Sequence, residues 1–328
     1  MKKKIITSLL VTILFCSGLR AQQDPMYSQY MSNSLAINPA FTGCRYSINA
    51  TVMRRMQWLG VSGAPTTTTL VLDAPIKSKQ FGVGLVLVNE QIGITSTTGV
   101  TLNYGYSIKV SEKNGTLSFG LNGSIVNLQM NLADVKTSIP DPEFGANFST
   151  WQPNVGVGVL YNTSKFYVGF SIPHIINNKL NKGGSTLEAL TGKQLRHLYL
   201  LSGYAFNLSD KLDLTTSTLI KYVTGSSIEL DLNANMWFYS KVSIGFGYRT
   251  SSEIIGQAQF RIGELVGIGY SYDYQLKSIQ RYTSGTHEIM LRVQFSKPKN
   301  NFRKNQSSST KNSNHVRSKK LSYLNNLF

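Results

Sequence analysis

Residues 266–274 read Val-Gly-Ile-Gly-Tyr-Ser-Tyr-Asp-Tyr, so that an apolar or aromatic side chain occupies every second position. A period of two with one apolar face is the pattern of a β-strand, because successive side chains point to opposite faces. The same alternation is clear in four further stretches, at 101–110, 117–122, 242–249 and 288–295. These stretches predict an all-β chain in which strand follows strand from Arg45 to Phe295.

Several of the alternating runs are long. They approach the roughly 9–11 residues that a tilted strand needs to cross a membrane, whereas strands of globular proteins are mostly about 5–6 residues long. Turn signals separate the runs at Asn114-Gly115, Ser209-Asp210, Thr224-Gly225 and Gly263-Glu264. We therefore predict a transmembrane antiparallel β-barrel of about 14 strands, of the outer-membrane type. Longer irregular connections are expected at Asn131–Pro153 and Pro173–Lys193.

The composition fits the same fold. Charged residues make up 15% of the chain, below the roughly 25% of soluble domains. The apolar fraction is 41% and the mean hydropathy is −0.12. A membrane barrel combines few charges with a neutral average, because lipid-facing apolar residues alternate with polar lumen residues. The 28 glycines and 17 tyrosines also suit barrel strands and their interfacial girdles.

The N-terminus has the pattern of a secretory signal peptide. Three lysines follow Met1, an apolar stretch runs from Ile5 to Phe15, and small or polar residues lead to Ala21. We predict a signal peptide over residues 1–21, because the apolar stretch is shorter than the roughly 20 residues that a membrane-spanning helix needs. Cleavage after Ala21 would leave Cys44 as a single cysteine, which cannot form an internal disulfide.

The net charge of +17 is concentrated near the two ends of the chain. Four basic residues lie in the predicted signal peptide and eight in residues 297–328, with no acid in either region, which leaves +5 for the part between them. A nucleic-acid-binding domain would carry a basic face, so this distribution argues against a nucleic-acid partner. We predict that residues 297–328 form a basic, disordered periplasmic tail. This tail is either a solvated extension or a segment that binds anionic lipid headgroups, cell-wall polymers or an acidic partner protein by charge.

No motif in the sequence points to a known chemistry. The four histidines, His174, His197, His287 and His315, are isolated from one another and from any cysteine or acid cluster with metal-ligand spacing. Gly-x-Gly fragments at 82–84, 156–158, 245–247 and 267–269 lie inside alternating runs, where a glycine that faces the lumen relieves crowding. The sequence therefore predicts no catalytic residue, no metal site, no cofactor and no enzymatic activity.

Six groups of short motifs follow one another in a specific order. They are QDPMYSQYM (23–31) with NPAFTG (38–43), RMQW (55–58) with PT (65–66), GVGLVLV (82–88), FYVGFSIPH (166–174), YSYDY (270–274) and SGTHEIML (284–291). In this order they resemble the PorP/SprF family of outer-membrane proteins, which is linked to the type IX secretion system and to gliding motility. The resemblance covers residues 22–295, and the tail beyond Phe295 departs from it.

The resemblance implies a non-enzymatic function in the outer membrane, namely secretion or surface anchoring of cargo proteins such as adhesins for gliding motility. It implies three kinds of partner: outer-membrane lipid, a secreted cargo protein with a C-terminal secretion domain, and periplasmic components of the secretion system. Two other functions stay open on the residues alone. One is an outer-membrane channel or transporter for small or hydrophobic solutes, and the other, with less support, is an outer-membrane enzyme.

Residues 22–44 hold the first motifs, show no alternation, and are rich in Tyr, Met, Asn and Pro. Such a segment suits a plug in the barrel mouth or lumen, or a docking surface for a partner, and a plain periplasmic leader is the alternative. We predict partner binding by eight of its residues: Asp24, Pro25, Tyr27, Gln29, Tyr30, Asn38, Pro39 and Gly43. The predicted organisation is a signal peptide (1–21), this N-terminal segment (22–44), the barrel (45–296) and the tail (297–328).

Overall fold

The computed structural model describes residues 25–45, 47–76, 80–110, 115–134, 147–178, 194–263 and 265–295. The predicted signal peptide and tail lie outside these ranges. The strands are β1 (Asn49–Met56), β2 (Thr66–Pro75), β3 (Phe81–Ile92), β4 (Thr95–Lys109), β5 (Thr116–Met130), β6 (Phe148–Asn162), β7 (Phe166–Ile172), β8 (His197–Ser209), β9 (Leu212–Val223), β10 (Glu229–Phe238), β11 (Val242–Arg249), β12 (Glu253–Ile262), β13 (Val266–Gln275) and β14 (Thr286–Gln294). Short 3-10 helices lie at η1 (Ser34–Ala36), η2 (Pro39–Phe41), η3 (Leu132–Asp134) and η6 (Ser278–Tyr282). None of the helices in the described ranges is long and apolar enough to cross a membrane.

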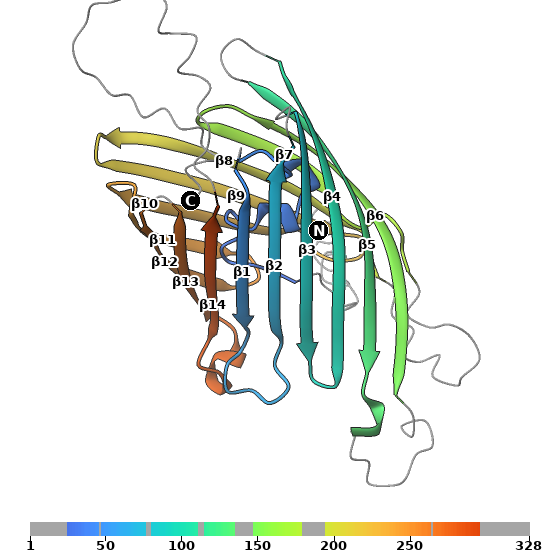
Figure 1. The fold of residues 1–328 in the computed structure, drawn as a ribbon. Coiled ribbons are helices and arrows are strands. Elements are labelled where there is room, and N and C mark those ends of the chain that lie inside the picture. Colours follow the sequence, from blue (N-terminus) through green and yellow to red (C-terminus); the bar gives the residue numbers. More distant parts are fainter. Residues whose placement is uncertain are drawn as a thin grey trace, which may run out of the picture.

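Each strand pairs antiparallel with its neighbours in sequence, and β1 pairs with β14 to close the sheet into a barrel (Figure 1). The closing pair runs from Asn49 opposite Gln294 to Met56 opposite His287. Closure matters in a bilayer, because backbone groups there must find their hydrogen bonds within the sheet. The predicted antiparallel barrel of about fourteen strands is confirmed.

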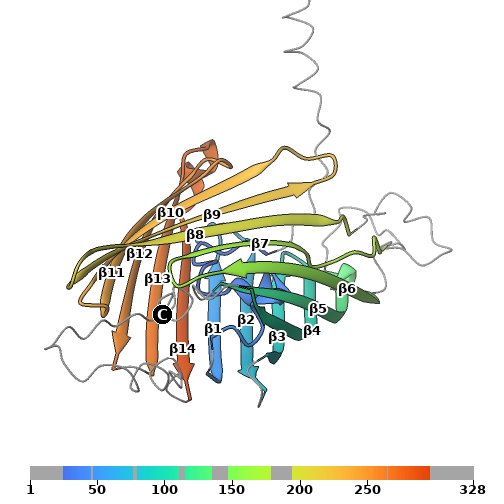
Figure 2. The same ribbon diagram turned by 90° about the horizontal axis from the view of Figure 1, so that it is seen from above.

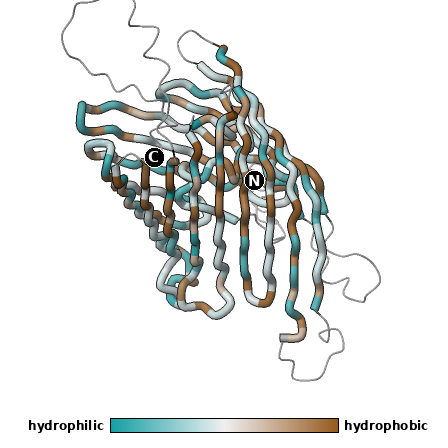
Figure 3. Tube along the Cα trace, viewed as in Figure 1, coloured by the Kyte–Doolittle hydropathy of each residue, from teal (hydrophilic) through white to brown (hydrophobic). Residues whose placement is uncertain are grey.

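Side chains alternate between the outer surface and the interior as the sequence predicts. Leu102, Phe246 and Ile268 point outward and are 65%, 70% and 42% exposed. The positions between such residues are buried, as at Ser271 and Glu288. Figure 3 shows brown and teal alternating along many strands. The outer surface is therefore mainly apolar, as contact with lipid requires.

The two ends of the barrel differ in the length of their connections. The four longest connections in sequence, 57–65, 131–147, 173–196 and 276–285, all join strand ends at the same end of the barrel. The other end carries short turns such as 163–165, 210–211 and 239–241, together with the start of β1 and the end of β14. Outer-membrane barrels have short periplasmic turns and longer extracellular loops. We therefore call the end with the long connections the outer end and the opposite end, which faces the periplasm, the inner end.

The wall next to β6 differs from the sequence-based expectation. The sequence predicts an irregular connection over Asn131–Pro153, but β6 already begins at Phe148. Its neighbour β7 is shorter, so the first part of β6 has no strand on that side among the described residues. Pro153 is compatible with such an edge, because it has no N–H that needs a partner. Beyond β7, the N–H of Ile175 donates to the carbonyl of Val155 at 2.9 Å, so an irregular segment continues the wall there.

Candidate functional site inside the barrel

Residues 25–45, hereafter the lumen segment, lie inside the barrel. Figure 2 shows this blue part of the chain enclosed by the ring of strands. Tyr30 and Ala40 are fully buried, and they belong to one hydrophobic cluster with inward-facing wall residues such as Leu160. The ring of Phe41 meets that of Tyr167 edge-on, with the ring centres 5.7 Å apart. The core of the molecule is thus made by the lumen segment together with the inner face of the sheet.

The lumen segment folds into two short 3-10 turns, η1 and η2. Asn38 precedes η2, and its side-chain oxygen accepts a hydrogen bond from the N–H of Ala40 at 2.9 Å. Asparagine favours this capping role, and Pro39 follows at the first helical position, where no N–H is needed. Gly43 comes after the turn with a φ of +74°, which glycine adopts without steric penalty.

Inward-facing glycines let the backbone of the segment touch the barrel wall. The Cα atom of Gly43 lies against Gly82 of β3, and Gly105 of β4 meets the same stretch of backbone. On β5, a Cβ atom added to Gly120 would lie 2.2 Å from the backbone nitrogen of Ala40. We call Gly82, Gly105 and Gly120 the glycine seat. A larger residue at any of the three would collide with backbone atoms, which cannot rotate away.

Asn38 also joins the segment to strands β6 and β7. Its Nδ2 donates to the carbonyls of Val159 at 3.2 Å and of Phe170 at 3.3 Å. Gly158 and Gly169 leave space for this side chain, since an added Cβ would lie 2.0 Å and 2.8 Å from its amide atoms. One asparagine therefore caps a turn and bridges two strands of the wall.

Charged side chains hold the part of the segment that lies nearer the outer end. Glu288 of β14 accepts hydrogen bonds from the backbone N–H groups of Ser28 and Gln29, both at 2.9 Å. Arg55 of β1 lies opposite Glu288 in the closing strand pair and donates to it at 3.2 Å. Arg55 also donates to Asp273 at 2.7 Å, and the Ser28 hydroxyl donates to the same carboxylate at 2.6 Å. These three charged side chains are buried.

A second arginine extends this network over β10 and β12. Arg249 lies opposite Asp231 and opposite Glu253 in the strand register, and it bonds both carboxylates. Its Nη2 also donates to the carbonyl of Tyr27 at 3.4 Å. Such pairing is what allows ions to be buried, because an unpaired buried charge is strongly unfavourable. We call the six residues Arg55, Asp231, Arg249, Glu253, Asp273 and Glu288 the charged cluster.

Further polar contacts fix the middle and the end of the segment. Arg292 of β14 and Arg45 both donate to the carbonyl of Ser32, the latter at 3.3 Å. At the inner end, Asp73 of β2 accepts a hydrogen bond from the N–H of Gly43 at 2.7 Å. The lumen segment is therefore bonded along its length to strands on several sides of the barrel.

Seven of the eight predicted partner-binding residues lie in the lumen segment, and Asp24 lies outside the described residues. The hydroxyl of Tyr27 bonds that of Thr69 at 2.8 Å, and the hydroxyl of Tyr30 bonds that of Ser217 at 3.0 Å. Gln29, Asn38 and Gly43 make the wall contacts given above, and Pro25 lines the cavity described below. Pro39 lies against Gly120, since a Cβ atom added to that glycine would lie 2.2 Å from the carbonyl carbon of Pro39. The structure brings the seven together inside the barrel, and their role toward a partner stays a prediction.

The charged cluster is not among the residues predicted from the sequence. A signal for it exists, since Arg249, Asp273 and Glu288 occupy inward positions of alternating runs. Ionisable residues in membrane-spanning segments face the interior and pair with one another, so these positions indicate buried ion pairs. Which charges meet depends on the strand register and on barrel closure, which the alternation alone does not define.

Cys44 lies near the inner end of the segment and is 7% exposed. Its thiol donates to the carbonyl of Ala40 at 3.2 Å. Burial raises the pKa of the Cys44 thiol to about 11. A thiol that stays protonated at neutral pH is a poor nucleophile, so Cys44 acts here as a packing residue.

The family described as type IX secretion system membrane protein PorP/SprF has a model that matches residues 19–293. The chain belongs to the PorP/SprF family. The match spans both the lumen segment and all fourteen strands up to the last residues of β14. The resemblance seen in the six groups of motifs is therefore confirmed, and it includes the residues that fill the barrel.

The barrel of this PorP/SprF protein is also similar to solved structures, at low identity. The toluene transporter TbuX of Ralstonia pickettii is 12% identical with a TM-score of 0.47, and the match covers 81% of this chain and 94% of that chain. The CymD monoaromatic hydrocarbon channel is 13% identical with a TM-score of 0.47, and the match covers 83% of this chain and 94% of that chain. The translocator domain of the autotransporter NalP from Neisseria meningitidis is 12% identical with a TM-score of 0.41, and the match covers 76% of this chain and 88% of that chain. A comparison with curated proteins finds no match.

The fold and the family together place the PorP/SprF protein in the outer membrane. A closed antiparallel barrel with an apolar outer face is the form in which strands span that membrane, and the family consists of membrane proteins of type IX secretion. Family and fold are those of a secretion-system barrel rather than of a known class of enzyme. Within the described ranges, no group of three or more His, Cys, Asp or Glu residues has the geometry to hold a metal ion.

Proposed function

We propose that this PorP/SprF protein is a plugged barrel that supports the secretion or surface anchoring of cargo proteins and does not act as an open pore. The observation that supports the proposal best is the lumen segment, which fills the interior and is bonded to strands around the barrel. A diffusion channel needs a water-filled lumen, whereas plugged barrels serve other purposes. A fixed plug therefore favours a role in holding a partner.

The cargo in this proposal is a secreted protein with a C-terminal secretion domain, and large adhesins that support gliding motility are the main candidates. Membership of the PorP/SprF family supports this choice. Periplasmic components of the secretion system would meet the inner end of the barrel, and the cargo would be retained at the outer end. The predicted partner-binding residues would act mainly by keeping the lumen segment in one position.

Comparison of surface proteins in cells with and without the barrel tests the secretory role. The proposal expects at least one large surface protein to disappear from the surface of cells that lack the barrel and to return when the intact gene is restored. Cells that lack the barrel but keep an unchanged set of surface proteins would contradict it.

Conductance of the purified protein in planar bilayers tests the absence of an open pore. The intact barrel should give no steady current, because the lumen segment interrupts any path for ions. A steady current through the intact protein would instead favour the alternative of an outer-membrane channel for small solutes.

A further inference from the structure

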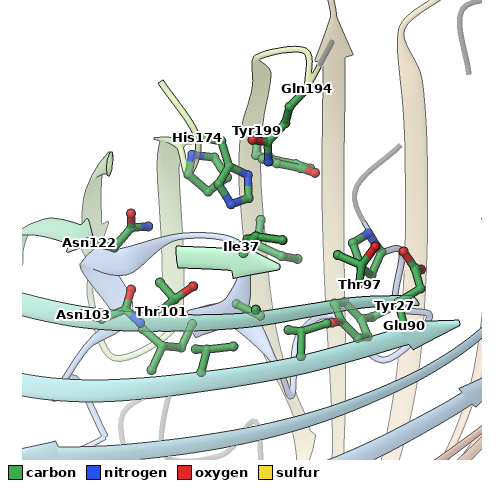
Figure 4. Close-up of a pocket in the computed structure, with 18 residues that line it drawn as sticks. Tyr27, Ile37, Glu90, Thr97, Thr101, Asn103, Asn122, His174, Gln194 and Tyr199 are labelled. Atoms are coloured by element: carbon green, nitrogen blue, oxygen red, sulfur yellow. The ribbon is translucent and has the colours of Figure 1, made fainter. Parts of the chain in front are cut away.

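A cavity lies between the lumen segment and the inner face of strands β3 to β5 (Figure 4). Its volume is about 140 Å³. Tyr27 and Leu35 form its wall on the side of the lumen segment, and Pro173, His174 and Tyr199 line it next to β7 and β8. Most strand residues in the lining belong to the half of their strand that is nearer the outer end. The cavity therefore lies on the side of the lumen segment that faces the cell exterior.

One part of the lining is aliphatic. It consists of Leu35, Ile37, Val86, Val88 and Val126. Leu35 and Val86 also pack together in a small hydrophobic cluster of their own, which keeps this wall in place. An engineered cavity of roughly this size, about 150 Å³ with an apolar lining, takes up a ligand as large as benzene. The cavity can thus hold one aliphatic side chain.

Another part of the lining presents amide groups. Asn103 and Asn122 lie opposite each other in the β4–β5 register, and both line the cavity. Asn103 is only 5% exposed, and its Nδ2 has no hydrogen-bond partner among the described residues. The same holds in these ranges for Oδ1 of Asn122. The lining of the cavity therefore includes one buried donor, Nδ2 of Asn103, and one buried acceptor, Oδ1 of Asn122, in addition to the aliphatic wall. Buried polar groups of this kind require hydrogen-bond partners.

We propose that the cavity binds an extended peptide residue with an aliphatic side chain, and that the secreted cargo supplies it. This inference rests on the function proposed above and names the chemistry of the contact. A peptide unit offers one C=O and one N–H, which match the donor of Asn103 and the acceptor of Asn122. A hydrocarbon would leave both amides unpaired, and a sugar would bury hydroxyl groups against the aliphatic wall. A peptide satisfies both parts of the lining.

Gly99 gives a way to fill the cavity without disturbing the wall. It lines the cavity, and a Cβ atom added to it would lie 3.4 Å from Val126, an ordinary contact. Gly99→Phe therefore places a ring in the cavity. Gly123→Phe is the matched control, because Gly123 is exposed on the adjacent strand and has no atom within 4 Å of an added Cβ.

The test measures surface display of the protein that disappears from cells lacking this barrel. In Gly99→Phe, display should fall by at least about tenfold, the change that a loss of about 1.4 kcal/mol in binding produces. In Gly123→Phe, display should equal that of the wild type, and both variants should still shift on gels after boiling, as closed barrels do. Unchanged display in Gly99→Phe overturns the inference and leaves the proposed function standing. Unchanged display in the complete absence of the barrel overturns the proposed function itself.

Asn103→Leu separates a peptide ligand from a hydrocarbon, because leucine is similar in size and lacks the amide. If a peptide occupies the cavity, this substitution should lower cargo display several-fold. Uptake of radiolabelled hexane by cells with this variant should then equal the uptake by cells that lack the barrel. Hexane uptake that depends on the wild-type barrel and is abolished by Gly99→Phe, with cargo display intact, would show a solute site and overturn the inference.

Discussion

The two sides of the lumen hold the same segment by different means. On β3, β4 and β5 the glycine seat brings wall and segment together backbone against backbone, around residues 39–43. On β1 and β10 to β14 the charged cluster binds the segment through ions and hydrogen bonds, around residues 27–29. The first side holds the segment by close steric packing, whereas the second holds it by hydrogen bonds to charged groups. The inner part of the segment is therefore fixed by sterics and the outer part by electrostatics.

This difference predicts that each side fails under a different kind of change. Larger side chains at the glycine seat would clash with the lumen segment, but no charge is needed there. A buried ion cluster tolerates changes of volume better than the loss of one partner, since a remaining charge would be left uncompensated. Substitutions that target one side at a time can separate the two contributions.

The largest effect is expected when the charged cluster loses an arginine. Arg55→Met leaves Asp273 and Glu288 buried without their main partner, which should destabilise the folded barrel by about 3–5 kcal/mol. Arg54→Met is the control, because Arg54 is the exposed neighbour on the same strand. Denaturant unfolding in detergent, followed by tryptophan fluorescence, measures both. Equal midpoints for the two variants would show that the cluster does not stabilise the fold.

A smaller effect is expected when the glycine seat is enlarged. In Gly120→Val the added atoms meet the backbone of Ala40, and overpacking of this kind typically costs about 1–3 kcal/mol. Gly123→Val is the control on the same strand, where an added Cβ meets no atom within 4 Å. The same unfolding experiment applies. If both valines were tolerated equally, the close approach at Gly120 would not exist in solution.

The smallest effect is expected at Asn38, which belongs to neither the glycine seat nor the charged cluster. Asn38→Ala removes a cap, for which a loss of about 0.5–2 kcal/mol is typical, together with its bonds to two wall carbonyls. Asn89→Ala is the control, since the Asn89 side chain makes one exposed hydrogen bond, to Thr98. Hydrogen exchange of the η2 amides should speed up only in the first variant. Identical exchange in both variants would contradict the bridging role of Asn38.

The parts of the fold that follow from local pattern could be predicted from the sequence. Leu102 and Phe246 face outward because strand alternation is a property of neighbouring residues. The start of β6 could not be predicted, because residues 148–153 include polar residues and a proline, which are not typical of a strand. They form a strand here along a part of β6 that β7 does not reach. Local pattern thus gives the facing of a strand more reliably than its bounds.

The contacts inside the barrel could be predicted only in part. The lumen segment has no period, so its sequence suits a plug or a docking surface, without indicating which wall residues it meets. Arg55 and Glu288 are 233 positions apart and become neighbours only because β1 pairs with β14. Long-range pairing of this kind depends on closure and register, which no local pattern contains.

The position of the lumen segment inside the assembled barrel can be measured through Cys44, the one free cysteine in the part of the chain that the structure describes. Outer membranes carrying the wild-type protein are treated with a maleimide at neutral pH, before and after unfolding in denaturant. Cys44 should stay unlabelled in the folded barrel and react after unfolding. Burial also raises the pKa of the Cys44 thiol, so at neutral pH the folded protein should be labelled far more slowly than the unfolded chain. Labelling of the folded protein at neutral pH, at the rate of the unfolded chain, would contradict a segment packed inside the barrel.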